Sequence, residues 1–252
     1  MTARRFAATV SYDGTAFVGS QVQPNGRTVQ QELESAAKAL FGTPTRVALA
    51  GRTDSGVHAN GQVMALSAET LLEPKTVGRA LNAHLPPDVS VRAVREVPAD
   101  FDPRRWARRR WYRYTIAHGE ARDPLSRRTA WYIEGSLDLP AMQQAASALI
   151  GQQDFRSCSG HLEPGRTSVR TVFRADWQSH GSASLFDIEA DAFLPQMVRR
   201  IVGGLVRVGR GTENVEEFVR SLRQAESGAI AHTAPAHGLC LQRVWYDEGY
   251  GL

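Results

Sequence analysis

The sequence has few of the features that mark secreted, metal-binding or membrane proteins. Its two cysteines, Cys158 and Cys240, lie far apart and in no C-x-x-C pair, so neither a disulfide framework nor a zinc site is indicated. No run of about 18 apolar residues is present to span a bilayer. The first residues, MTARRFAATVSYDG, contain no apolar stretch of signal-peptide length. We therefore expect a cytoplasmic protein in which both cysteines are bystanders.

Lysine is also scarce. Lys38 and Lys75 are the only lysines, every other member of the 30 basic residues is arginine, and the formal net charge is +4. Arginine presents a planar fork that suits phosphate groups and stacks on bases, which is consistent with a nucleic-acid partner. A general preference for arginine in the genome would give the same ratio. The positions of the arginines are therefore more informative than their number.

Several arginines are clustered. The clusters are RRWARRRWYRY at 104–114, Arg127 with Arg128, and Arg199 with Arg200. In the first cluster they alternate with Trp106, Trp111, Tyr112 and Tyr114. Basic groups for phosphates and aromatic rings for unstacked bases are what recognition of flexible RNA requires. A solvated edge strand would carry similar charge with fewer aromatics.

The 252 residues, 42% hydrophobic and 22% charged, are typical of a globular protein with one large core or two medium ones. Thr28 and Gln31 have the spacing of a capping box, which predicts a helix that ends at Gly42. Further helices are expected near 76–84, 139–150, 195–208 and 213–224, with strands at 6–12, around 49, after 62, from 89, and at 111–117, 168–178, 183–191 and 239–246.

This mixture lacks regular βαβ spacing and predicts an α+β fold with a mostly antiparallel sheet. We divide the chain into an N-terminal lobe, 1–105, and a C-terminal lobe, 106–252. The absence of a low-complexity linker suggests that the lobes share a continuous sheet around a central basic cleft.

One polar loop, GRTDSGVHANGQV at 51–63, lies between two apolar alternations. Asp-Ser-Gly is a common turn sequence, because the carboxylate can bond its own backbone and glycine accepts a positive φ. Local composition alone favours that interpretation. A functional interpretation of the loop needs support from other motifs.

Such motifs occur in order along the chain. They are YDGT at 12–15 with Phe17, Gly19, Gln21 and Gln23; TVQ at 28–30 with Leu33-Glu34; Leu81-Asn82 with Leu85-Pro86; Phe101-Asp102 with Arg104; YRY at 112–114; Asp154-Phe155; RTV at 170–172; FLPQMVRRIVGGLVRVGRG at 193–211; and APAHGLCL at 234–241. With the 51–63 loop, they make the chain resemble the TruA family of tRNA pseudouridine synthases over nearly its full length. Two departures are Ser20, where the family usually has Trp, and Cys158, where it usually has an aromatic residue.

The resemblance implies the pseudouridine synthase fold, with two ferredoxin- or RRM-like lobes, and an isomerase that needs no metal or redox cofactor. The reaction breaks the C1′–N1 bond of a uridine, turns the base and rejoins it through C5. A carboxylate can stabilise or trap the positive charge that develops at the sugar. The resemblance gives this role to Asp54, and leaves open whether it attacks C1′ or removes a C2′ proton.

Other site residues follow from the same resemblance. Arg199 is the basic partner of the aspartate, although Arg199 and Arg200 could instead be a solvated face. Tyr112 is the active-site tyrosine, a stacking group and a candidate base for the C5 proton. From its position beside Gly238, Leu239 is expected to form an apolar wall of the uracil pocket. Arg52, two residues before Asp54, is expected to hold the flipped phosphate or fill the gap, and Arg110 and Arg113 of the basic cluster to hold the tRNA backbone.

We expect Tyr114 to be a core aromatic and His58 a structural hydrogen-bonding residue. The expected partners are tRNA, modified at uridines 38 to 40 of the anticodon stem-loop, and a second copy of the chain in a homodimer, with no membrane.

Two other functions remain open from the residues. Asp54 and His58, four apart, could ligate a divalent ion in a hydrolase, although the other histidines form no metal-binding pattern with them. A non-catalytic RNA-binding module would also account for the arginines and aromatics. Such a module has no need for an acidic residue in a basic surface.

Overall fold

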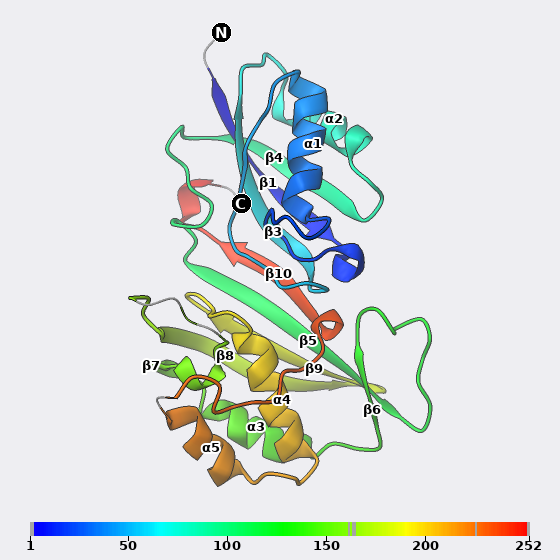
Figure 1. Ribbon diagram of the computed structural model, residues 1–252, viewed down its shortest axis with the longest axis vertical. Coiled ribbons are helices and arrows are strands. Elements are labelled where there is room, and N and C mark those ends of the chain that lie inside the picture. Colours follow the sequence, from blue (N-terminus) through cyan, green and yellow to red (C-terminus); the bar gives the residue numbers. More distant parts are fainter. Residues whose placement is uncertain (1–2, 161, 163–164, 225, 251–252) are drawn as a thin grey trace. The chain divides into compact units, whose positions relative to one another are not determined.

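The computed structural model describes residues 3–160, 162, 165–224 and 226–250 (Figure 1). The chain forms two compact units, one of Met1–Arg109 with Leu241–Leu252 and one of Arg110–Cys240, and each is described by itself. This division differs from the predicted ranges chiefly at the C-terminal end. Strand β10 (Leu239–Trp245) is the neighbour of β3 (His58–Ala68), which assigns the end of the chain to the first unit.

The sheet of the first unit has the strand order β4-β1-β3-β10. Strand β1 (Arg4–Tyr12) is antiparallel to both β3 and β4 (Val89–Val97), and the short β2 (Val47–Leu49) pairs with β3. Helices α1 (Val29–Phe41) and α2 (Pro74–His84) lie together on one side of this sheet (Figure 1). The predicted Thr28–Gln31 capping box is confirmed, with both of its hydrogen bonds present.

An aromatic cluster packs on small residues of the same sheet. Ala7 and Ala65 lie opposite each other on β1 and β3 and, with Phe101, are buried beneath Trp106, Tyr246 and Tyr250. The Trp106 ring lies 6.1 Å from that of Phe101 and 5.2 Å from that of Tyr250, both edge-on. Trp106 therefore has a packing role that the arginine–aromatic pattern did not predict.

The second unit is built on the strand order β5-β9-β8-β7. Its members are β5 (Arg109–Gly119), β7 (Gly151–Asp154), β8 (Val169–His180) and β9 (Ala183–Ala190), all antiparallel to their neighbours, with β6 (Trp131–Glu134) parallel to β5. Helices α3 (Leu139–Ser147), α4 (Met197–Gly209) and α5 (Val215–Arg223) group together beside this sheet (Figure 1). The two units confirm the predicted α+β class with a mostly antiparallel sheet.

Strand β5 has one apolar and one polar face. Tyr112, Tyr114 and Ile116 are buried on the first, as the period of two requires. On the second, Trp111 and Arg113 bond the same carboxylate, that of the fully buried Asp187 on β9. This hydrogen bond to Asp187 raises the pKa of the Arg113 guanidinium.

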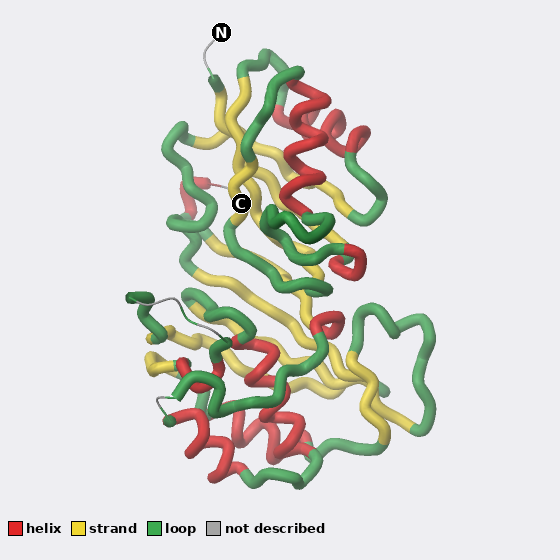
Figure 2. The backbone as a smooth tube through the Cα atoms, viewed as in Figure 1, coloured by secondary structure: helices red, strands yellow, loops and turns green. Residues whose placement is uncertain are grey.

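A long loop joins β5 to β6 and stands away from the sheet (Figure 2). The Tyr132 hydroxyl closes its base by donating to the Gly119 carbonyl at 2.9 Å. Arg127 and Arg128 are exposed on this loop, and Leu125 at its outer turn is 90% exposed.

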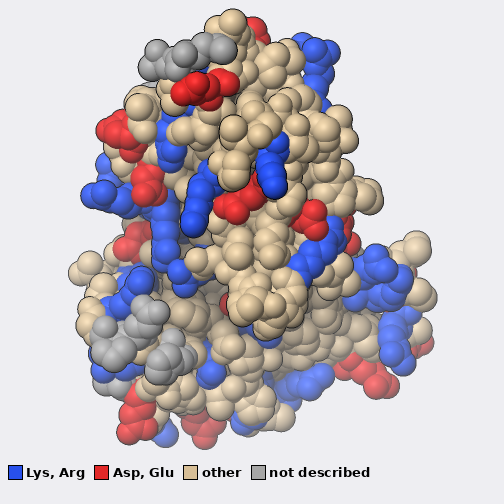
Figure 3. Space-filling model, turned by 45° about the horizontal axis from the view of Figure 1, so that its top comes forward, with Lys and Arg blue, Asp and Glu red and all other residues tan. Residues whose placement is uncertain are grey.

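Basic and acidic side chains are interspersed on the face drawn in Figure 3. Attraction for phosphates must therefore come from local groups of arginines rather than from one uniformly basic face. None of the helices within the described ranges combines the length and the apolar character that crossing a bilayer requires.

Candidate active site

Residues 50–57 connect β2 to β3 and contain a tight turn, whereas residues 58–63 of the predicted loop already belong to β3. The Val57 N–H donates to the Asp54 carbonyl at 3.2 Å, and Gly56 has a φ of 77°. The simple interpretation of Asp-Ser-Gly as a turn is therefore correct. Arg52 is exposed and Asp54 partly buried at this turn, and what distinguishes it from an ordinary turn is how firmly its neighbours are held.

Thr53, the residue before Asp54, is bonded through three of its polar groups. Its N–H donates to the Ser20 hydroxyl at 2.8 Å, and its carbonyl accepts the Ser20 N–H at 3.1 Å. Its own hydroxyl lies 2.8 Å from the phenol oxygen of Tyr12, which is 5% exposed. Buried hydrogen bonds of this kind are costly to break. The backbone that leads into Asp54 is consequently fixed.

The segment after YDGT holds the other side of the turn. Gly19 and Asp54 form an antiparallel bridge, and the Phe17 carbonyl accepts from the Gly56 N–H at 3.3 Å and the Ser55 hydroxyl at 3.2 Å. Gly14 lies so close that a Cβ there would come within 2.1 Å of the Val57 carbonyl oxygen. These contacts explain why the two motifs occur together.

His58 has the structural role that we predicted. It is 6% exposed, and its Nδ1 accepts the Gly14 N–H at 3.0 Å. That nitrogen therefore has no lone pair left for a metal ion, which weakens the interpretation of Asp54 and His58 as a metal pair. Within the described part of the chain, no group of three or more His, Cys, Asp and Glu side chains could hold a metal ion.

Gln62 supports the start of the loop. Its side chain is fully buried, and its amide donates to the Gly51 carbonyl at 2.9 Å, one residue before Arg52. The contributions of Gln62, Ser20 and Tyr12 were not predicted from the sequence. Tyr12 and Gln62 do lie inside the motifs that carry the family resemblance. The resemblance alone, however, gives these two residues no physical role.

In the second unit, Arg199 and Tyr114 hold one segment between them. Arg199, near the start of α4, donates from Nε to the Ala234 carbonyl at 2.8 Å, and its own carbonyl accepts the Ala234 N–H at 3.0 Å. The Tyr114 hydroxyl donates to the Pro235 carbonyl at 2.8 Å. Burial raises the pKa of Tyr114, and the charge of Arg199 acts in the opposite direction. The prediction that Tyr114 is a core aromatic is confirmed.

Leu239 follows this segment and is 5% exposed. Gly238 before it is packed so closely that a Cβ would lie 2.6 Å from Cζ of Tyr114. Tyr112, two residues from Tyr114 on the same face of β5, is 8% exposed, and its ring meets Phe193 edge-on at 5.1 Å. Arg110 donates from Nη1 to the Asp191 carbonyl at 2.5 Å.

The predicted site residues are therefore divided between the two units. Arg52 and Asp54 belong to the first, on a turn held by Tyr12 and Ser20. Within the second unit, Arg199 bonds Ala234 and Tyr114 bonds Pro235, so both side chains hold the same segment. Tyr112 lies two residues before Tyr114 in β5, and Leu239 follows the held segment in the chain. Arg110 and Arg113 point to opposite faces of β5.

Comparison with known proteins identifies the family of the chain. A family model described as tRNA pseudouridine synthase matches residues 8–104 and 145–247. The chain belongs to the tRNA pseudouridine synthase family. Members of this family are isomerases, and the predicted resemblance to its TruA branch is confirmed by individual relatives.

Three relatives named tRNA pseudouridine synthase A illustrate the similarity. The one from Citrifermentans bemidjiense is 41% identical over 249 residues, covering 97% of this chain and 98% of the relative. The one from Myxococcus xanthus is 42% identical, covering 97% and 93%, and that from Roseiflexus castenholzii is 44% identical, covering 97% and 92%. Residues 105–144, which include Tyr112, lie between the two stretches matched by the family model.

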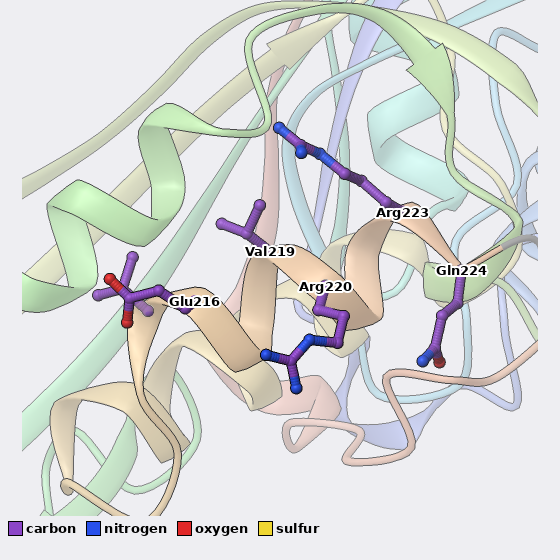
Figure 4. Close-up of a pocket in the computed structure, with 6 residues that line it drawn as sticks. Glu216, Val219, Arg220, Arg223 and Gln224 are labelled. Atoms are coloured by element: carbon purple, nitrogen blue, oxygen red, sulfur yellow. The ribbon is translucent and has the colours of Figure 1, made fainter.

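A groove outside this site lies along α5 in the second unit. It measures about 550 Å³ and is lined by Val215, Glu216, Val219, Arg220, Arg223 and Gln224 (Figure 4). No residue of the predicted site lines it. Arg220 and Arg223 are exposed there, which makes them useful as control arginines below.

Proposed function

We propose that this synthase converts uridine to pseudouridine in the anticodon stem-loop of tRNAs, at positions 38 to 40, and that Asp54 acts on the ribose of a flipped uridine. The observation that carries the proposal is the fixed presentation of Asp54. Thr53 before it is bonded at its N–H, carbonyl and hydroxyl. A turn that served only to reverse the chain would not need all three bonds.

The reaction conserves every atom of the uridine except one exchanged proton. The C1′–N1 bond breaks and leaves its electrons on the base, the base turns, and a C1′–C5 bond forms. The C5 proton then leaves to a base and ends in water, and N1 takes up a proton. Asp54 either attacks C1′ to give a sugar ester whose C1′–O bond breaks as the C1′–C5 bond forms, or removes a C2′ proton that returns to C2′ when that bond forms. One carboxylate is sufficient because nothing is hydrolysed.

The second unit supplies the other groups. Arg199 provides the positive charge that keeps a working carboxylate ionised in a dry site. Leu239 gives the uracil an apolar wall, and Tyr112 stacks on the base. Arg199 is hydrogen-bonded to Ala234, five residues before Leu239. One short segment therefore connects the positive charge of Arg199 to the apolar wall formed by Leu239.

The uridine must leave its stack to be reached, which costs roughly a few kcal/mol. Arg52 and Arg110 hold the backbone around the flipped nucleotide. Arg113 forms an ion pair with Asp187, which offsets its charge, so we assign it a smaller share of backbone binding than Arg52 and Arg110. A homodimer in the cytoplasm, in which one subunit holds the tRNA body while the other carries out the chemistry, would select the site by shape.

The test is tritium release. Unmodified tRNA carrying 5-³H-uridine is incubated with the protein in EDTA, and tritium in water is counted for wild type and Asp54→Ala. We expect release by wild type, none by Asp54→Ala, and tRNA affinities within about threefold of each other, because the aspartate makes no phosphate contact.

Two results would contradict the proposal. Release that persists in Asp54→Ala would remove the aspartate from the chemistry. Binding of tRNA by wild type without any release would favour the alternative of an RNA-binding module.

A further inference from the structure

We infer that Ser20 is a positioning residue for Asp54, and that its hydroxyl sets the rate of the reaction without contacting the substrate. This inference rests on the proposed function, because it assumes that Asp54 performs the chemistry. It concerns a residue that the predicted site did not include.

Ser20 is well placed to transmit rigidity. It is fully buried. Its carbonyl accepts the N–H of Gln30 in the first turn of α1 at 2.9 Å. Because α1 is packed on the first unit through Val29, Leu33, Ala36 and Ala37, Ser20 is tied to a stable element rather than to another loop.

Ser20 then fixes both peptide groups that flank the Cα atom of Thr53. Its hydroxyl accepts the Thr53 N–H at 2.8 Å, which fixes the peptide before that Cα. Its N–H donates to the Thr53 carbonyl at 3.1 Å, which fixes the peptide after it. With both peptides held, the φ and ψ angles of Thr53 are set, and so is the direction in which the chain enters Asp54.

The backbone half of this arrangement needs no particular side chain, but the hydroxyl half does. Only a side chain with an acceptor at this position can take the Thr53 N–H, and the Ser20 hydroxyl supplies that acceptor at 2.8 Å. A displacement of about 1 Å at a reacting group can cost roughly 100-fold in rate.

The experiment compares Ser20→Ala, which removes the acceptor, with Ser20→Cys, which keeps a similar size but has a weakly accepting sulfur. Ser157→Ala is the matched control. Ser157 is also fully buried, and its hydroxyl also makes a 2.8 Å bond to a backbone group, the Leu222 carbonyl, but in the second unit. kcat and KM are measured by tritium release, tRNA Kd by filter binding, and stability by thermal melting.

We expect kcat to fall in the order wild type, Ser20→Cys, Ser20→Ala, by roughly 10- to 100-fold in the last, with tRNA Kd changed by less than about threefold. Ser157→Ala should lower the melting temperature to a similar degree and leave kcat within about twofold. Tyr12→Phe, which removes only the phenol oxygen at Thr53, should lower kcat in the same way as Ser20→Ala.

The inference is wrong if both Ser20 variants keep wild-type kcat while Asp54→Ala is inactive. It is also wrong if Ser20→Ala loses stability and Ser20→Cys retains full activity, because Ser20 would then be structural only. Activity in Asp54→Ala would instead overturn the proposed function and remove the premise. The two failures are therefore distinguishable in one set of measurements.

Discussion

The Tyr114 hydroxyl donates to the Pro235 carbonyl at 2.8 Å, and this bond ties the centre of β5 to the segment that precedes Leu239. Tyr114 itself is fully buried. The bond therefore connects a rigid part of the second unit to the apolar wall that we propose for the uracil. The position of Leu239 depends on the space that the Tyr114 ring leaves beside Gly238.

Replacing Gly238 by alanine should therefore disturb the site. The new Cβ would lie 2.6 Å from Tyr114 Cζ, and overpacking of this kind typically costs about 1–3 kcal/mol of stability. Because Leu239 must move with its neighbour, we also expect kcat/KM to fall at least tenfold. Thermal melting and tritium release measure the two effects.

Gly181→Ala is the control for this variant. Gly181 has a φ of 62°, so alanine is strained there, but its Cβ would meet nothing within 4 Å. It should lose stability and keep its kcat/KM. Equal losses of kcat/KM in Gly238→Ala and Gly181→Ala would show that displacement of Leu239 does not cause the loss of activity.

Replacing Tyr112 by phenylalanine separates stacking from proton transfer. The ring would keep its edge contact with Phe193, and only the hydroxyl would be lost. If the phenol removes the C5 proton, turnover should fall by roughly 100-fold or more while tRNA binding is retained. Tritium release under single-turnover conditions measures this step, and unchanged release would exclude an obligatory phenolic base.

The loop between β5 and β6 should contribute to tRNA affinity through its exposed arginines. We expect Arg127→Ala with Arg128→Ala to weaken tRNA binding about tenfold at low salt and to reduce the slope of log K against log salt by roughly one to two. Filter binding at several salt concentrations gives both values. kcat at saturating tRNA should not change.

The matched control is Arg220→Ala with Arg223→Ala in the α5 groove (Figure 4), where two exposed arginines are also removed from the second unit. This pair should leave the salt slope almost unchanged. If both double variants weaken binding equally, only net charge matters, and the loop has no specific role.

Cys158 should resist alkylation in the folded protein. It is fully buried, and burial raises the pKa of its thiol to about 12. At pH 8 the reactive thiolate is therefore almost absent, and access is closed as well. Iodoacetamide followed by peptide mass spectrometry should label Cys240, which is partly exposed, much faster than Cys158.

Unfolding in guanidinium should remove the difference between the two cysteines. Rapid labelling of Cys158 in the native protein would mean that the second unit opens more readily than its packing indicates.

Much of the fold could be predicted because its signals are local. The Thr28–Gln31 spacing defines the start of α1, and Gly42, with a φ of 75°, defines its end. Tyr114 was expected in the core, and it is fully buried. By contrast, β6 and β7 have four residues each, which is too short for a periodic pattern to be recognised.

The unpredicted features depend on contacts between residues far apart in the chain. Nothing in the local sequence of Ser20 shows that its hydroxyl meets Thr53, which is 33 residues away. The same is true of Arg113 and Asp187, which are 74 residues apart and form an ion pair. From the neighbouring arginines and aromatics in the sequence alone, Arg113 is expected to bind RNA. Motif matching proposes Asp54 as a candidate, but only the tertiary structure shows what holds its neighbour Thr53.

The return of β10 to the first unit has a consequence for biosynthesis. Strand β3 pairs with β1 and the short β2 early in the chain, but its neighbour β10 comes only from Leu239–Trp245, and Tyr250 completes the aromatic cluster on Phe101. A ribosome therefore has to make nearly the whole chain before the half that carries Asp54 can close. Until then the part of β3 that β1 and β2 leave uncovered presents an unpaired edge, which in a nascent chain is a site for aggregation or for a chaperone.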